Sequence, residues 1–270
     1  MHNTNLSKER LSYLSKVKKD KAVVTFFRCF ILVLFIAVWE ISAHFNIIDS
    51  FVLSSPSRIL KVLLNFNKNN FPLHIYTTLF ETVVGFLLGI IIGVALASAL
   101  WWSPFLSKVS EPYLVVLNSL PKIALGPVII IWAGAGVRAI IFMALAISTI
   151  VTVLVMLEGF KSTDQDLIKM AKTFGATRLQ IFFKIVLPFN ISTLFNSLKI
   201  NIGLSLVGVI AGEFLVSKAG LGYLIVYGGQ VFKMDLVMTS VLILSVAAAI
   251  MYEFIVISEK LTLKFINHKG

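Results

Sequence analysis

The stretch TDQDLIKMAKTFGATRLQIFFKIVLP, residues 163–188, is a charged, helix-forming island between long apolar segments. Thr163 is predicted to cap a first helix, because its hydroxyl can accept a backbone N–H, and Asp166 lies where a negative charge favours a helix N-terminus. Gly175 is predicted to end this helix in a left-handed conformation. The apolar side chains of the helix share one face at helical spacing; they are Leu167, Met170, Ala171 and Phe174.

A second helix is predicted after Gly175. Thr177 and Gln180 form the T-x-x-Q pattern of a capping box. Pro188 is predicted to end the segment where the chain re-enters the membrane. Two short helices joined at a sharp corner, with charges of both signs, favour docking of a cytoplasmic protein; an amphipathic loop lying on lipid headgroups is the alternative.

Around the island, the composition indicates an integral membrane protein. Of the 270 residues, 58% are hydrophobic and 14% are charged, with a mean hydropathy of +0.93, whereas soluble domains carry about 25% charged residues. The net charge of +11 would suit nucleic acid, but the basic residues flank apolar segments. Membrane topology therefore explains them better, and no nucleic-acid partner is expected.

Six apolar segments are long enough to cross a bilayer, since about 20 helical residues cover about 30 Å. They span residues 26–45, 79–101, 114–133, 139–157, 191–215 and 236–258. The third is interrupted by Pro121, Lys122 and Pro127. Because no barrel-type alternation is present, an all-α bundle of six transmembrane helices is predicted. We expect the first span to be retained, because Phe30–Trp39 leads into Glu40 without a signal-peptide cleavage pattern.

The positions of Lys and Arg predict the orientation. The two terminal regions and the island hold the larger share of the 24 Lys and Arg residues, so the positive-inside rule predicts that both termini and the island are cytoplasmic. The predicted organisation is a basic N-terminal tail (1–25), one transmembrane domain (26–258) with a cytoplasmic coupling loop (159–189), and a C-terminal tail (259–270).

Several residues inside the predicted spans suggest close packing or a translocation path. Glycines at four-residue spacing allow helix backbones to approach closely, and packing within the chain is favoured over a subunit interface or a gate for Gly85, Gly89, Gly93, Gly208 and Gly212. The prolines of the third span free backbone groups that only protein or a water-filled cavity can satisfy, so this span is expected to face the bundle interior.

Polar residues in the third and fifth spans are the candidates for lining the path: Asn118, Lys122, Asn196, Lys199, Asn201 and Ser205. Two alternatives stay open. Lys122 could instead extend towards an interface, and Lys199 could pair with an acid on another helix. The chain has no G-x-x-x-x-G-K-[ST] phosphate-binding sequence, and its histidines lack metal-ligand spacing. Nothing in it indicates an enzyme, a cofactor or a metal.

The island resembles the cytoplasmic signature of permease subunits of ATP-binding-cassette (ABC) importers. That signature reads E-A-A, three residues, G, nine residues, then I-x-L-P. Ala171 matches the final alanine, Gly175 the glycine, and Ile185 follows it after nine residues, with Pro188 closing the match. Lys169 departs from the pattern, because a glutamate is usual there and helps to hold the ATPase subunit; Met170 also replaces an alanine.

Three further segments are similar to the branch of this family that imports nitrate, sulfonates, taurine and thiamine precursors: SSPSRIL (54–60), LPKIALGPVIIIWAGAG (120–136) and GEFLVSKAGLGYLI (212–225). The resemblance implies the type I importer fold, known as MetI-like, in a prokaryotic cell membrane. It also implies a second permease copy or a homologue, an extracytoplasmic solute-binding protein, and cytoplasmic ATPase subunits that bind the ATP.

The resemblance implies ATPase contacts along the coupling loop. They would involve Asp166, Leu167, Lys169, Met170, Ala171, Phe174, Gly175, Ala176, Arg178, Leu179 and Pro188. The alternatives are a secondary transporter or channel working without ATP, which would be expected to carry paired ionisable groups at mid-membrane, and a scaffold that only recruits a cytoplasmic partner.

Overall fold

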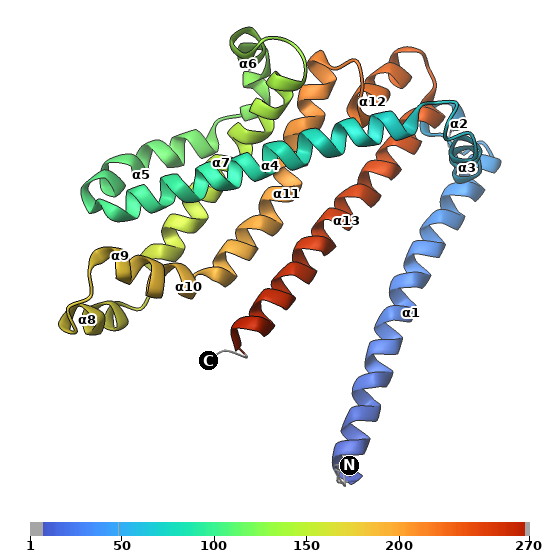
Figure 1. Ribbon diagram of the computed structural model, residues 1–270. Coiled ribbons are helices and arrows are strands. Elements are labelled where there is room, and N and C mark those ends of the chain that lie inside the picture. Colours follow the sequence, from blue (N-terminus) through green and yellow to red (C-terminus); the bar gives the residue numbers. More distant parts are fainter. Residues whose placement is uncertain (1–7, 48, 268–270) are drawn as a thin grey trace. The chain divides into compact units, whose positions relative to one another are not determined.

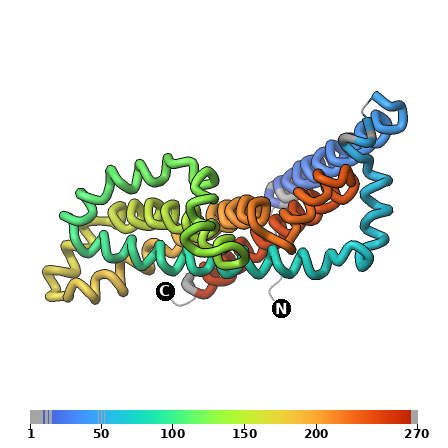
Figure 2. Tube along the Cα trace, turned by 90° about the horizontal axis from the view of Figure 1, so that it is seen from above, coloured from blue at the N-terminus to red at the C-terminus, as the bar shows by residue number. Residues whose placement is uncertain are grey.

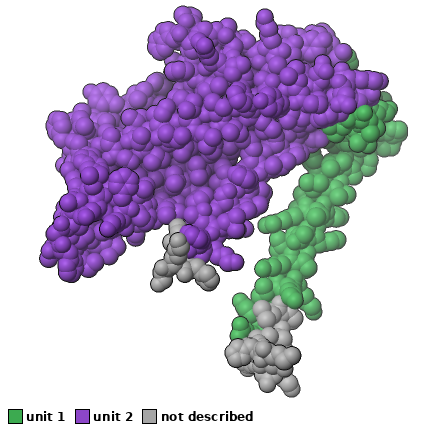
Figure 3. Space-filling view, viewed as in Figure 1, with its two compact units in different colours: residues 1–64 green, residues 65–270 purple. Residues whose placement is uncertain are grey.

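The computed structural model describes residues 8–47 and 49–267, and throughout these ranges the regular elements are helices. The chain divides into two compact units, residues 1–64 and 65–270 (Figure 3). The division falls inside the transmembrane domain predicted for residues 26–258.

The first unit contains α1 (Lys8–His44), α2 (Ser50–Leu53) and α3 (Pro56–Leu64). Most of the predicted N-terminal tail therefore belongs to the same helix as the first span, because neither glycine nor proline interrupts residues 8–44. The backbone N–H of Ser57 donates to the Glu40 carboxylate at 3.0 Å, which joins the start of α3 to the end of α1.

The second unit holds the remaining helices (Figure 1). In chain order they are α4 (Phe71–Trp102), α5 (Pro104–Ser119), the 3₁₀ turn η1 (Lys122–Leu125), α6 (Gly126–Ala133), α7 (Val137–Lys161), α8 (Gln165–Thr173), α9 (Arg178–Ile181), the π-helical turn η2 (Phe182–Val186), α10 (Leu187–Phe189), α11 (Ile191–Val216), α12 (Leu221–Gln230) and α13 (Met234–Asn267). The island, α8 to α10, lies at one end of α7 and α11, and α6 and α12 lie at the other end.

Five helices in the described ranges are long and apolar enough to cross a membrane: α1, α4, α7, α11 and α13. The segments Pro104–Ser119 and Lys122–Ala133, bent by 85° at their break, count as a sixth when the bent pair is taken as one span. This bent pair contains the predicted third span, and the break follows Leu120, whose extended backbone precedes Pro121. The six predicted spans are therefore all present as helices, the third in broken form.

Helix α7 is packed between α4 and α11 (Figures 1 and 2). The glycines make these contacts close: a β-carbon at Gly85 would lie 2.6 Å from the Ala144 β-carbon, and one at Gly208 would lie 2.7 Å from the Ala144 α-carbon. A β-carbon at Gly93 would similarly meet Thr152 at 2.5 Å. Packing within the chain, the use predicted for these glycines, is confirmed.

Helix α12 lies outside the predicted spans and is held by side chains of α4 and α11. The Leu221 N–H donates to Thr78 Oγ1 at 2.8 Å, and the Gly222 N–H donates to Glu213 Oε2 at 2.5 Å. Thr78 in turn donates to Glu213 Oε1 at 2.6 Å. Thr78 and Glu213 are buried, so the helix N-terminus is satisfied by tertiary contacts rather than by its own cap residue.

Candidate functional site

The island begins at a cap different from the predicted one. Asp164 is the N-cap of α8, and its carboxylate accepts a hydrogen bond from the Asp166 N–H at 2.8 Å. The prediction that Thr163 caps this helix is wrong. The Thr163 hydroxyl is buried and accepts a hydrogen bond from Asn190 Nδ2 at 2.9 Å. Because Asn190 directly precedes α11, this bond ties the two ends of the island together.

The corner after α8 forms as predicted. Gly175 has φ +78°, in the left-handed region that glycine adopts without steric cost. Its N–H donates to the Lys172 carbonyl at 2.9 Å, and the Ala176 N–H donates to the Ala171 carbonyl at 3.0 Å. These two bonds make up a Schellman motif, which satisfies carbonyl groups at the end of α8.

The predicted capping box is also confirmed. The Thr177 N–H donates to Gln180 Oε1 at 2.8 Å, and the Gln180 N–H donates to Thr177 Oγ1 at 3.3 Å. The corner is therefore bounded by a satisfied helix end on one side and a satisfied helix start on the other. The backbone on either side of the corner is therefore held in a defined conformation.

The prediction that Pro188 ends the segment is wrong. The wide turn η2 and the short helix α10 carry a helical path from α9 to Asn190, and α11 starts at the next residue. Pro188 lies in the first turn of α10, where a missing N–H is tolerated. Beside it, the Leu187 N–H reaches back five residues to the Phe182 carbonyl, as a π-helical turn allows.

Aromatic side chains anchor the inner side of the island. The buried ring of Phe182 lies 5.1 Å from Trp101, 5.9 Å from Trp102 and 5.5 Å from Phe160, measured between ring centroids. The two tryptophans end α4, and Phe160 belongs to the last turn of α7. The guanidinium of Arg178 lies 6.0 Å from the Trp102 ring centroid, at the limit of a cation–π contact.

The anchor extends into an apolar core beneath α8 and α9. Its buried members are Ala97, Met156, Leu157, Phe160, Ile168, Ile181, Phe182 and Val186. Ala171 packs against this core from above. Ala171 was predicted to share one helix face with Leu167, but the two differ in environment. Ala171 packs against the core, whereas Leu167 is exposed.

The outer side of the island presents large apolar side chains to solvent. We call these residues the docking face: Leu167 (38% exposed), Met170 (54%), Phe174 (82%), Leu179 (57%) and Phe183 (59%). Leu167, Met170 and Phe174 precede the Gly175 corner, and Leu179 of α9 and Phe183 of η2 follow it. Clustered exposed apolar side chains outside a membrane span commonly mark a surface for another protein.

Lys169, which departs from the family pattern, pairs with an acid of its own helix. Its ammonium lies 3.0 Å from Asp166 Oδ1, and both side chains are exposed. Asp164, the other acid near the start of this helix, is its N-cap residue. The positive charge of Lys169 is therefore paired with an acid three residues earlier on the same helix.

The structure brings the two path candidates of the broken span together. Lys122 Nζ donates to the Asn118 backbone carbonyl at 2.9 Å and lies 3.5 Å from Asn118 Oδ1. Lys122 also lines a cavity of about 370 Å³ whose other lining residues are apolar, among them Trp132 and Phe142.

The path candidates of α11 fall on different faces. Asn201 and Ser205 are buried in the bundle, and Asn201 Nδ2 donates to Thr152 Oγ1 of α7 at 2.9 Å. Asn196 is exposed. It lies on an exposed stripe at helical spacing that continues through the apolar residues Ile200 and Val207.

Lys199 faces α13. Its ammonium lies 2.5 Å from the Glu259 carboxylate, and the two side chains are 22% and 17% exposed. The alternative in which Lys199 pairs with an acid on another helix is therefore the arrangement found. Lys199, Asn201 and Ser205 therefore lie away from the exposed face of α11. This face carries no charged residue.

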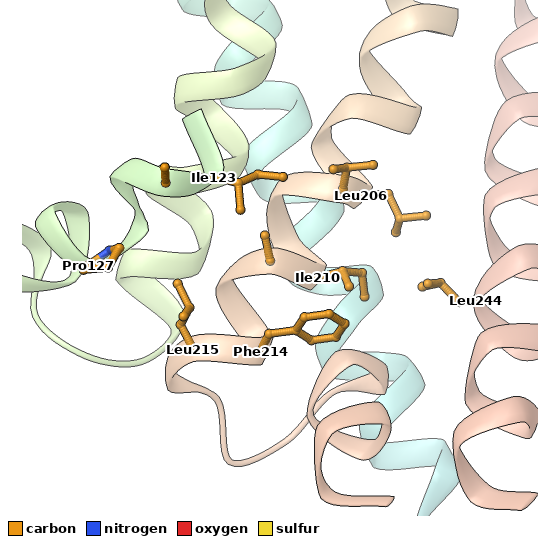
Figure 4. A pocket seen from close by; sticks show the side chains of 10 residues that line it. Ile123, Pro127, Leu206, Ile210, Phe214, Leu215 and Leu244 are labelled. Atoms are coloured by element: carbon orange, nitrogen blue, oxygen red, sulfur yellow. The ribbon is translucent and has the colours of Figure 1, made fainter. Parts of the chain in front are cut away.

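An apolar cavity of about 540 Å³ opens beside that face (Figure 4). It lies between the turn η1 with α6, helix α11 and helix α13. Figure 4 shows Ile123 and Pro127 on one side, Ile210 and Phe214 from α11, and Leu244 from α13. All ten lining residues are apolar.

Several residues of the anchored site were not predicted. Asn190 and Trp102 showed no helical or motif signal by themselves, and their roles depend on neighbours distant in sequence. One usable signal existed: Trp101 and Trp102 stand side by side where the predicted second span ends, and tryptophan is enriched at membrane interfaces.

Residues 85–264 match the family described as "Binding-protein-dependent transport system inner membrane component". Among curated proteins, a probable ABC transporter permease of Haemophilus influenzae is 28% identical over 207 residues, covering 77% of this chain and 84% of that protein. The formylaminopyrimidine transport permease ThiX of Halalkalibacterium halodurans is 28% identical over 69% of this chain and 74% of that protein. The Escherichia coli taurine permease TauC is 25% identical, with 80% and 81% covered.

Solved structures share the fold. A chain of the inward-facing methionine ABC transporter MetNI superposes with a TM-score of 0.64 at 18% identity, covering 69% of this chain and 93% of that chain. A chain of a bacterial ABC transporter that imports alginate also gives a TM-score of 0.64, at 14% identity, covering 92% and 98%.

Proposed function

Because this chain belongs to the family of binding-protein-dependent transport system inner membrane components, we propose that its docking face couples the membrane helices to a separate ATPase. The chain is the membrane component of a transport system and not an enzyme. The observation that supports the coupling role is the exposed apolar surface on both sides of an anchored corner. A partner covering this surface would bury five large apolar side chains, among them Phe174.

The anchoring explains how a push on the docking face would reach the spans. Phe182 packs on the ends of α4 and α7, and Asn190 joins the start of the island to the start of α11. A displaced island therefore carries α7 and α11 with it as a packed unit rather than bending as a free loop. Alternating access driven by ATP in the partner requires such a connection.

The proposed path runs along the exposed face of α11 and past the break between α5 and α6. Asn196 and the apolar cavity lie on this side, and Lys122 lies at the break. Asn201, Ser205 and Lys199 would support the bundle rather than line the path. A second copy of the chain, facing the first, would enclose the path; this arrangement is part of the proposal.

We also propose an orientation of the chain in the membrane and a class of transported solute. The positive-inside rule supports placing the island and both termini in the cytoplasm of a prokaryotic cell. The solute would be small and delivered by an extracytoplasmic binding protein. Similarity to permeases named for formylaminopyrimidine and taurine supports thiamine precursors, sulfonates and taurine as candidate solutes. Nitrate is a further candidate solute, from the sequence resemblance.

The docking assignment is tested by replacing Met170 and Phe174 together with alanine. Co-purification of the ATPase with the full-length permease is expected to fall at least tenfold, because the removed side chains are the centre of the proposed contact. Phe105→Ala is the matched control, since Phe105 is 74% exposed on α5 and outside the docking face. Wild-type recovery of the ATPase with the double variant would contradict the assignment.

An uptake measurement distinguishes the proposed ATP-driven transport from the alternative, transport without ATP. In vesicles containing the permease and the binding protein, uptake is expected only when the ATPase and ATP are supplied. Uptake at the full rate without the ATPase would replace the proposed coupling with secondary transport or a channel.

A further inference from the structure

A cluster of basic side chains lies on α1, directly before the apolar stretch of this helix. Lys16, Lys18, Lys19 and Lys21 are exposed, and no ion pair to them occurs among the described residues. We call these four residues the lysine collar. Asp20 is the one acidic residue between positions 10 and 39, so the collar keeps a clear excess of positive charge.

The depth of the collar follows from the length of the helix. Residues 22–39 of α1 form an apolar stretch in which Arg28 is the one charged residue. At about 1.5 Å per residue this stretch covers about 27 Å, close to the hydrocarbon thickness of a bilayer. The collar occupies the next five residue steps, about 8 Å, which matches the headgroup layer of roughly 5–8 Å on each side of the hydrocarbon.

The directions of the four side chains favour lipid over a protein partner. An α-helix turns by about 100° per residue, so Lys21, Lys18 and Lys19 point about 140°, 200° and 300° around the axis from Lys16. A protein groove would contact one side of the helix and leave part of the collar unused. Headgroups of surrounding lipids can reach all four side chains.

We propose that the lysine collar binds the headgroups of anionic lipids around α1. The charge is complementary, the depth is that of the phosphate groups, and the collar surrounds the helix. This role is separate from solute transport and from ATPase docking. Each lysine near an anionic surface is expected to strengthen binding about fivefold, and added salt should weaken the preference because it screens exposed charges.

The test is a lipid-retention measurement on the full-length protein in detergent. Phosphatidylglycerol or phosphatidylcholine is titrated, and the lipids retained per protein are counted by native mass spectrometry. The wild-type protein is expected to prefer phosphatidylglycerol, and raising NaCl from low to high concentration should reduce the preference. Lys18→Gln should lower the preference about fivefold, and replacing all four lysines with glutamine should abolish it.

Two controls separate charge at the collar from overall charge and from folding. Replacing the four lysines with arginine keeps the charge and should keep the preference. Replacing Lys68, Arg138, Lys218 and Lys233 with glutamine removes four exposed positive charges elsewhere and should also keep it.

Three outcomes would overturn the proposal. One is an undiminished preference in the four-glutamine variant, and another is an equal loss in the variant altered elsewhere. The third is loss of the ATPase from the four-glutamine variant with unchanged lipid retention, which would make the collar a protein-docking surface.

Discussion

The inner and outer sides of the island differ in what surrounds their side chains. On the inner side, Phe182 is buried against aromatic rings at the ends of α4 and α7, and Asn190 is buried against Thr163. On the outer side, Phe174 is 82% exposed although it is as large and apolar as Phe182. The contrast separates two environments: the inner side holds the island to the bundle, and the outer side stays exposed, as the proposed docking requires. Substitutions on the two sides should therefore affect different measurements.

The largest effect is expected for Phe182→Ala. Removing a ring packed among Trp101, Trp102 and Phe160 should destabilise the protein by about 3–5 kcal/mol, measured by thermal unfolding of the purified chain in detergent. Phe174→Ala is the control, because this ring is equally large but 82% exposed. Equal losses for the two variants would mean that the island is not anchored through Phe182.

A smaller loss is expected for Asn190→Ala, about 1–3 kcal/mol, because the buried Thr163 hydroxyl and the Val186 carbonyl would each lose a hydrogen bond. Hydrogen exchange of the island should also rise if its two ends separate. Asn196→Ala, at an exposed position of α11, should change neither quantity. Unchanged exchange in Asn190→Ala would show that the two ends are held by other contacts.

Gly175→Ala is expected to cost about 1 kcal/mol. A β-carbon there would meet no atom within 4 Å, so the cost comes from the left-handed backbone alone. Gly203→Ala provides a matched comparison, since this glycine also has open space but lies inside α11, where alanine is the better helix former. The two substitutions should change the unfolding temperature in opposite directions; a shift in the same direction would contradict this account of the corner.

The smallest effect on stability is expected for Lys169→Glu, below about 1 kcal/mol. The substitution removes an exposed pair with Asp166 and places two like charges on one helix face. Thermal unfolding should barely change, and Lys172→Glu, at an exposed position on the same helix, serves for comparison. A loss comparable with that of Phe182→Ala would show that the Lys169 pair supports the fold.

Local patterns predicted the features whose causes lie within a few residues. The six spans, the Gly175 corner and the Thr177–Gln180 capping box all depend on hydropathy, on a backbone angle, or on groups three residues apart. Predictions failed where two neighbours competed for one role: Asp164 displaced Thr163 as the cap because Asn190, distant in sequence, holds the threonine hydroxyl.

The residues of the proposed path show the limit of prediction from composition. The polar residues of α11 were grouped because they share one span, yet a helix has several faces. Asn201 lies against α7, Lys199 lies against α13, and Asn196 is exposed. Hydropathy cannot assign these faces, because the assignment depends on which helices pack on which side.

The sequence by itself determined that this is a helical membrane protein with a charged island, and the spacing within that island was enough to indicate its family. These properties follow from apolar segment length and from local hydrogen-bonding patterns. Only the tertiary structure decided which side of the island is anchored and which is exposed. The reason is that Phe182 and Phe174 are chemically alike, and what separates them is contact with the ends of α4 and α7, which lie far away in the chain.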